Sequence, residues 1–127
     1  MIVVDASAAV SALLNAGPAR QALASEQLHA PHLIDSEVAN ALRRRVAAKQ
    51  LTAGDGWTGL NALKHLGMKR YPVFAFLDRI WELRANLSAY DASYVGLAEL
   101  LGCDLLTGDG RLARAPGVRC STTVVPR

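Results

Sequence analysis

The sequence lacks any long hydrophobic run. Its longest apolar stretches, such as residues 8–14, fall far short of the roughly 18 residues that a membrane span requires. The first five residues, MIVVD, are typical of a strand and lack the basic start and long apolar stretch of a secretory signal. We therefore expect a cytoplasmic protein.

Cysteine and histidine are too few and too scattered for a zinc site. Cys103 and Cys120 form no CxxC pair and have no histidine nearby at zinc-binding spacing. His29 and His32 flank Pro31, which keeps them from sharing a helical face, and the third histidine stands alone. We expect no zinc, and we expect Cys103, within an apolar run, to be a small buried residue.

Aromatic residues are also scarce, at 6% of the chain. RNA bases often stack on aromatic side chains in sequence-specific complexes. Here Trp57, Phe74 and Trp81 lie at helical spacing, which is more typical of a core or a protein interface.

Hydrophobic residues are plentiful, at 51%, which excludes a disordered chain and fits an α/β fold. Short β-branched or apolar runs predict strands at 2–4, 27–30, 103–107 and 118–125, with 69–73 either a strand or an extended connection. Helices are predicted at 7–15, 18–25, 34–49, 52–67, 74–86, 88–101 and 111–115. Strands separated by helices imply a parallel sheet with helices on both faces. With no repeat or linker in view, we expect residues 1–127 to form a single domain.

Four carboxylates, far apart in sequence, each occur where a strand-like run gives way to the start of a helix. They are Asp5, Glu37, Asp91 and Asp109. In a parallel α/β sheet the carboxyl ends of the strands and the starts of the following helices share one edge, so these acids are expected to meet. Like charges repel, and a divalent cation holds them together. The leading hypothesis is a metal-dependent hydrolase, with Mg²⁺ or Mn²⁺ better suited than zinc to an all-oxygen ligand set.

Each acid taken alone also has a structural interpretation. Asp5 and Ser7 are both residues that cap helices. Glu37 lies in the first turn of a long helix, where the helix dipole favours negative charge. Neighbouring Asp35 serves equally well as a cap or a ligand.

The other two acids are similar in this respect. Asp91 completes a capping-box pattern with Ser88. Asp109 lies between two glycines and is typical of a turn or a helix cap. The functional interpretation therefore depends on the four acids as a set.

A net charge of +3 that includes these four acids implies a mildly basic body around an acidic site. This arrangement suits a polyanionic substrate, although the same balance also serves solubility alone. Arg43, Lys49 and Arg111 are the leading candidates for RNA contacts. Solvated helix faces are an equal alternative for these three and for the other basic residues considered, Arg44, Arg45, Lys69 and Arg70.

Four segments together resemble a known family. They are MIVVDAS at the start, LIDSEVANAL around Glu37, YDASY around Asp91 and LLTGDGRL around Asp109. The set resembles PIN domains and, more narrowly, the VapC-type toxins of bacterial toxin–antitoxin pairs. The resemblance extends over nearly the whole chain, in the family's order and at close to its usual spacing.

The resemblance implies a three-layer α/β/α sandwich with a short parallel sheet and an acidic cluster that binds Mg²⁺ or Mn²⁺. It matches Asp5, Glu37, Asp91 and Asp109 to the family's acids. Ser7 and Thr107 match supporting hydroxyl positions, and Asn40 matches a frequent polar neighbour. The first, third and fourth acids are expected to be the main metal contacts, while Glu37 orients a metal-bound water or binds a second ion.

The implied activity is hydrolysis of single-stranded or loop RNA by a metal-activated water, leaving 5′-phosphate and 3′-hydroxyl ends. Implied partners are a cognate antitoxin and a second copy of the chain in a homodimer. The apolar helices near residues 60–66 or 74–87 are candidate surfaces for either partner. Gly108 and Gly110 are a small departure, since they loosen the turn around Asp109.

Two rival functions are weaker. A signalling receiver domain needs paired acids after its first strand and a lysine after its fifth, whereas this chain has one acid there and no lysine beyond Lys69. A catalytically silent PIN-like module that binds only RNA or protein is the second alternative. The intact set of acids argues against it.

Overall fold

The computed structural model describes residues 1–127 and contains one sheet of five parallel strands. The strands lie in the order β3-β2-β1-β4-β5. Their bounds are β1 (Ile2–Val4), β2 (Leu28–Pro31), β3 (Met68–Tyr71), β4 (Asp104–Thr107) and β5 (Thr122–Val124). The uncertain segment around residue 70 is thus a strand, because all of β3 pairs in register with β2.

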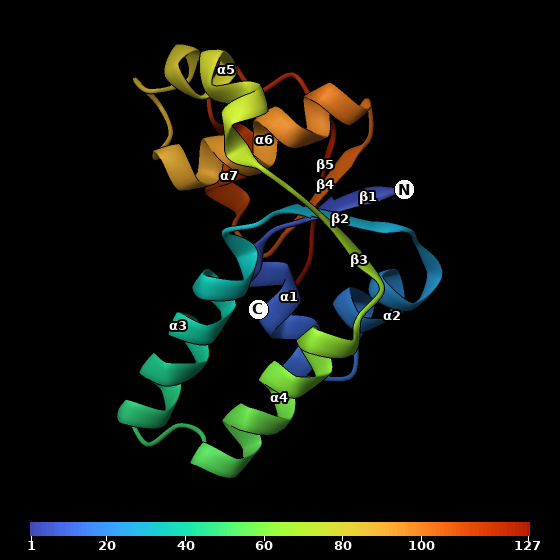
Figure 1. Cartoon of the computed structure of the whole chain (residues 1–127), viewed down its shortest axis with the longest axis vertical. Coiled ribbons are helices and arrows are strands. Elements are labelled where there is room, and N and C mark those ends of the chain that lie inside the picture. The colour runs from blue at the N-terminus through green and yellow to red at the C-terminus, as the bar shows by residue number, and fades with distance from the viewer.

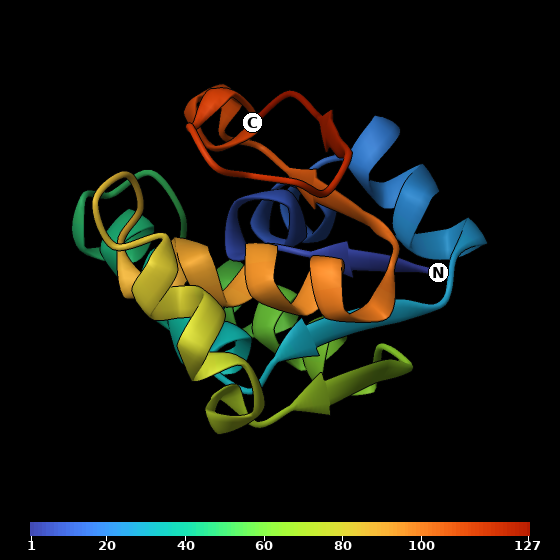
Figure 2. The same cartoon turned by 90° about the horizontal axis from the view of Figure 1, so that it is seen from above.

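Helices cover both faces of this sheet, which confirms the predicted three-layer α/β/α architecture. One layer holds α1 (Ala6–Leu14), α2 (Pro18–Ser25), α3 (Ile34–Ala47) and α4 (Ala53–His65). The opposite layer holds the 3-10 helix η1 (Val73–Phe76), α5 (Leu77–Glu82) and α6 (Ala89–Leu101). Short α7 (Gly110–Arg114) lies beside β4 and β5. Figure 1 and Figure 2 show the sheet between these layers, with α1–α4 on one side and α5 and α6 on the other.

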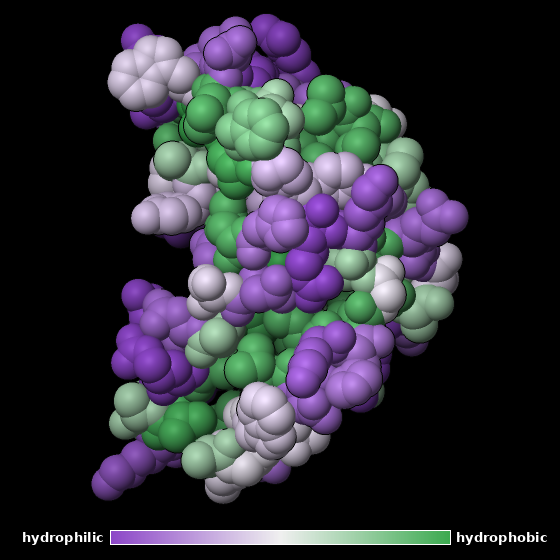
Figure 3. Space-filling model, viewed as in Figure 1, coloured by the Kyte–Doolittle hydropathy of each residue, from purple (hydrophilic) through white to green (hydrophobic).

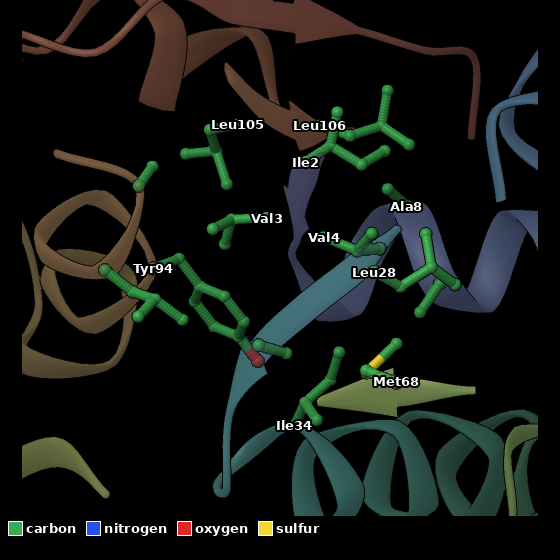
Figure 4. Packing of buried hydrophobic residues seen from close by; sticks show 14 of the residues in the cluster. Ile2, Val3, Val4, Ala8, Leu28, Ile34, Met68, Tyr94, Leu105 and Leu106 are labelled. Carbon is green, nitrogen blue, oxygen red and sulfur yellow. The ribbon is translucent and has the colours of Figure 1, made fainter. Parts of the chain in front are cut away.

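The sheet is held by apolar burial on both faces. β1 lies at the centre, between β2 and β4, and its residues Ile2, Val3 and Val4 are all buried. Figure 4 shows their side chains among those of Leu28, Leu105 and Leu106, which come from the neighbouring strands β2 and β4. Because both faces of a parallel sheet are covered, its central strands are continuous apolar runs rather than alternating ones.

The strand order reverses beside β1, and this reversal positions the site. From β1 the chain moves outward to β2 and β3, then returns to the other side of β1 for β4 and β5. In open α/β sheets a crevice forms outside the carboxyl ends of the strands at such a switch point. Asp5 follows β1 and Thr107 ends β4, so both lie at this crevice.

Two predicted elements are shorter in the structure. The expected helix over residues 74–86 divides at Phe76, where φ is −132° and the buried ring packs against Gly96. A Cβ at Gly96 would stand 3.3 Å from that ring, so the close contact depends on glycine. The expected strand over residues 118–125 is shorter in the structure, where β5 begins only at Thr122, five residues after a turn at Gly117 with φ +89°.

Several apolar side chains stay outside the core. Trp57, Phe74 and Trp81 are 59%, 74% and 68% exposed, so none of the three is a core residue. Cys103 and Cys120 are both half-buried free thiols, so the expectation that Cys103 is buried is wrong. No helix of the structure has the length and apolar character that crossing a membrane would take.

Candidate metal-dependent active site

Asp5 is fixed at the centre of the crevice by the junction of β1 and α1. Its side chain caps α1 by accepting a hydrogen bond of 2.9 Å from the backbone N–H of Ala8. The same carboxylate oxygen accepts the Ser7 hydroxyl at 2.7 Å, and the other accepts the Thr107 hydroxyl. Asp5 is therefore a helix cap and a cavity residue at once, and its position is set by three donors.

Ser7 and Thr107, the hydroxyl residues that the resemblance points to, connect Asp5 to the loop after β4. Ser7 Oγ accepts the backbone N–H of Gly108 at 2.8 Å, while Thr107 Oγ1 accepts that of Asp109 at 3.0 Å. A Cβ at Gly108 would stand 3.1 Å from Ser7 Oγ. Gly108, which was expected only to loosen this turn, therefore allows the loop after β4 to approach Ser7 closely.

Glu37 enters the site from the first turn of α3 and meets a residue that sequence reasoning missed. The hydroxyl of Tyr94, on α6, donates a hydrogen bond of 2.6 Å to Glu37 Oε1. Figure 4 shows the Tyr94 ring reaching from α6 toward Ile34 at the start of α3. A signal was present, because Tyr94 follows Asp91 by three residues and so shares its side of the helix.

Asp91 and Asp109 approach the crevice from two further helix starts. Ser88 caps α6 by accepting the backbone N–H of Asp91 at 3.1 Å, so this half of the predicted capping box and a cavity position coexist. Asp109 caps α7 and pairs with the guanidinium of Arg111 at 3.2 Å. Each structural interpretation of these acids therefore holds without excluding a second role.

All four acids line one open cavity of about 780 Å³. In Figure 3 the surface is hollowed at the left edge, between the parts of the chain that Figure 1 labels α3 and α6. Asn40 lines it too, whereas Asp35, the alternative ligand, does not. Asp35 instead accepts two hydrogen bonds, of 2.7 and 2.8 Å, from the guanidinium of Arg70.

The basic residues divide between the cavity and the outer surface. Arg44, Arg45 and Arg127 line the cavity, while Lys49 and Arg43 do not, and Arg43 donates to Asn40 at 3.0 Å. The signal for the α3 arginines was helical spacing, since positions 37, 40, 41, 44 and 45 share one face. Arg111 reaches the site only through its ion pair with Asp109.

The electrostatics of the four acids differ. Burial raises the pKa of Asp5, with its three hydrogen bonds offsetting part of the rise and Asp109 adding to it. Burial also raises the pKa of Glu37 and of Asp91, and the other carboxylates add to both shifts. The pKa of Asp109 is lowered, chiefly by its hydrogen bonds from Arg111. Three acids thus hold protons more tightly than free carboxylates do, a strain that a bound cation relieves.

The chemistry of the donor set fits a hard cation, because every candidate ligand is a carboxylate oxygen with hydroxyl support. As the side chains stand, no three acidic side chains are close enough to share one ion. Asp109 is turned into its pair with Arg111, whose side chain is 84% exposed. An exposed partner of this kind is displaced at little energetic cost, since surface ion pairs contribute little to stability.

Comparison with known proteins identifies a family and similar ribonucleases. The PIN domain family matches residues 2–118 of the chain. Ribonuclease VapC9 of Mycobacterium tuberculosis is 58% identical over 127 residues, which is the whole of both chains. Among solved structures, PAE2754 of Pyrobaculum aerophilum superposes with a TM-score of 0.72 and 25% identity, covering 95% of this chain and 81% of that one.

A second solved structure shares the fold at lower identity. VapC20 of Mycobacterium tuberculosis, a toxin that cleaves the sarcin–ricin loop, superposes with a TM-score of 0.69 and 20% identity. The match covers 94% of this chain and 97% of that protein. At this identity the likeness concerns the three-layer architecture.

Proposed function

This chain belongs to the PIN-domain family and is of the VapC toxin type, and from that membership we propose that it is a metal-dependent endoribonuclease. The substrate is single-stranded or loop RNA, and residues 1–127 act as one nuclease domain. The observation that carries the proposal is the convergence of Asp5, Glu37, Asp91 and Asp109, from four helix starts, on one cavity.

Asp5, Asp91 and Asp109 would hold Mg²⁺ or Mn²⁺. When bound, the ion supplies a lowered pKa for water and neutralises charge that develops on the phosphodiester. Asp5 is suited to the role because three hydrogen bonds fix its carboxylate before any ion arrives. Ser7 and Thr107 contribute by setting that orientation, as partners of ligands do in other metal sites.

Glu37 would orient the attacking water. Its carboxylate lies on the α3 wall of the cavity and one oxygen is held by Tyr94, which leaves the second oxygen without a protein hydrogen-bond partner and able to accept from water. The water attacks phosphorus and the 3′-oxygen leaves, which gives the 5′-phosphate and 3′-hydroxyl ends that the family resemblance implies. No covalent intermediate is needed, and no histidine lines the cavity to activate Ser7.

A cognate antitoxin and a homodimer complete the proposal, with the activity placed in the cytoplasm. Exposed apolar side chains supply surfaces for protein partners: Trp57 on α4, and Phe74, Leu77 and Trp81 on η1 and α5. A nuclease that acts on the RNA of its own cell requires an inhibitor, which is the role of the antitoxin.

The test is cleavage of a labelled single-stranded RNA in Mg²⁺, with and without EDTA. We expect cleavage that EDTA stops and that excess Mg²⁺ restores, and we expect Asp5→Ala and Asp91→Asn to abolish it. Mapping the 5′ ends of cellular RNA after induction would then name the substrate. Undiminished cleavage by both variants would refute the site, and RNA binding without cleavage would favour the silent PIN-like module.

A further inference from the structure

The residues that follow β5 run into the active-site cavity and are fastened there. The backbone N–H of Val125 donates to the carbonyl of Thr107 at 2.8 Å. The hydroxyl of Ser11, on α1, donates to the carbonyl of Pro126 at 2.7 Å. Val125 is 5% exposed, so apolar burial adds to these two bonds. This segment is therefore part of the wall of the site.

Arg127 is held by its Nε, while its two terminal nitrogens make no hydrogen bond. Its Nε donates to the carbonyl of Gly108 at 3.0 Å, and its Cγ lies 3.1 Å from where a Cβ of Gly108 would stand. Nη2 forms a loose ion pair with Oδ2 of Asp109 at 3.8 Å, which is beyond hydrogen-bond distance. Both terminal nitrogens of Arg127 thus keep their donors, and the side chain is 60% exposed at the cavity.

Arg111 differs from Arg127 in this respect. Three of its N–H groups, one from the backbone and two from the guanidinium, bond to Asp109. Arg127 is the cavity arginine whose position is fixed by the β4 loop and whose fork has no partner within hydrogen-bond distance. A planar fork with two free ends matches the geometry of a phosphate.

The other cavity arginines lie on a different wall of the cavity from Arg127. Arg44 and Arg45 belong to the α3 wall, whereas Arg127 belongs to the wall formed by α1 and the β4 loop. A polyanion lying across the four acids would then meet cations on both sides. The acids repel RNA phosphates, so fixed cations on each wall are needed to hold the strand.

We propose that Arg127 is a substrate-binding residue that contacts an RNA phosphate beside the one that is cut, and that Ser11 positions it through Pro126. The inference rests on the proposed nuclease function and adds a contact to it. It assigns to Arg127 a role in binding the strand rather than in the chemical step.

The experiment measures RNA binding apart from cleavage. A fluorescein-labelled single-stranded RNA is titrated with protein in EDTA across a range of salt, followed by anisotropy. We expect Arg127→Ala to weaken binding about tenfold, the scale of one charge-assisted hydrogen-bonded contact. The slope of log affinity against log salt should fall by about 0.7, as for one phosphate contact on a single strand. Arg127→Lys should restore the slope and only part of the affinity.

A matched control variant and a double-mutant cycle of Ser11 and Arg127 distinguish a specific contact of Arg127 from a general effect of net charge. Arg119→Ala removes an exposed arginine that lies outside the cavity, and it should bind as the wild type does. Ser11→Ala should weaken binding in the wild type but not in the Arg127→Ala background. In Mg²⁺, Arg127→Ala should raise KM with kcat nearly unchanged, as expected when ground state and transition state lose the same contact.

Three outcomes would overturn the inference. Arg127→Ala and Arg119→Ala that bind RNA equally would exclude the contact while leaving the nuclease function intact. Faster cleavage by Arg127→Ala would mean that this side chain masks Asp109. A wild-type protein that neither binds nor cuts RNA would remove the proposed function together with the inference.

Discussion

Tyr94 and Glu37 are 57 residues apart in sequence, and the hydroxyl of one donates a hydrogen bond of 2.6 Å to the carboxylate of the other. This bond joins α6 to α3 across the carboxyl edge of the sheet. Tyr94 is 1% exposed, so its ring belongs to the core while its hydroxyl belongs to the site. Tyr94 therefore both packs in the core and orients the carboxylate of Glu37.

Tyr94→Phe tests that relationship. The hydroxyl lowers the pKa of Glu37 against the larger upward effect of burial, so its removal should raise that pKa further. If Glu37 works as a carboxylate, the acid limb of the cleavage profile should move to higher pH. The loss of a buried hydrogen bond should also reduce the free energy of unfolding by about 1 kcal/mol.

Tyr71→Phe is the matched control, because its hydroxyl bonds to His29 outside the cavity. It should lower stability without moving the pH profile. An unshifted profile in Tyr94→Phe would show that Glu37 need not be ionised for cleavage.

Asp91→Asn should abolish cleavage and raise thermal stability. Burial and the other acids raise the pKa of Asp91, so between its unfolded and folded pKa values the folded state binds more protons. Stability contributed by this group is then lost as pH rises through that window, and the penalty is complete at neutral pH. The variant should melt higher than the metal-free wild type at pH 7.5.

The difference should vanish below the ordinary pKa of an aspartate, where the wild-type side chain is protonated in both states. Melting curves at several pH values, recorded in EDTA, check the sign. Added Mg²⁺ should raise the melting temperature of the wild type more than that of Asp91→Asn, because an ion that binds only the folded state stabilises it. A variant that melts lower at every pH would contradict this account.

The position of the acids could be predicted from the sequence because it depends on topology. Asp5 follows a strand of three apolar residues, and a parallel sheet fixes the edge at which that strand ends. Likewise, the loop after β4 had to lie beside Asp5 once β1 and β4 were neighbours. Adjacency of this kind follows from the strand order of a doubly wound sheet and needs no knowledge of side-chain packing.

The arginines could not be placed in the same way. Arg43, Arg44 and Arg45 are consecutive on one helix, and helical spacing separates Arg44 and Arg45 from Arg43 only once Glu37 is taken to face the cavity. Arg127 was beyond reach for another reason, since its place depends on where β5 ends. The path of the chain beyond that end is set by single hydrogen bonds of residues 125–127.

Thr107→Val tests the hydroxyl that serves two acids. Valine keeps the shape but cannot donate to Asp5 or accept from the backbone of Asp109. Thr107 is fully buried, so we expect unfolding to become easier by about 2 kcal/mol. Cleavage should fall about tenfold or more, the usual effect of removing a residue that orients a metal ligand.

Thr123→Val is the control on the neighbouring strand, where the side chain is exposed and makes no hydrogen bond in this structure. It should cleave RNA as the wild type does and unfold at a similar denaturant concentration. Equal activity in the two variants would mean that Asp5 keeps its orientation without Thr107.

Asp35 and Glu37 offer the sharpest comparison, because both acids lie in the first turn of α3 and only one lines the cavity. Asp35 is occupied by the guanidinium of Arg70 and is 46% exposed, so Asp35→Asn should change stability by no more than about 1 kcal/mol. Its rate of RNA cleavage should stay near that of the wild type. Glu37→Gln, an equally conservative change, should reduce the rate at least about tenfold if the carboxylate helps to deprotonate or orient water. Loss of cleavage in Asp35→Asn with activity retained in Glu37→Gln would exchange the roles of the two residues and place the site on the Arg70 side of α3.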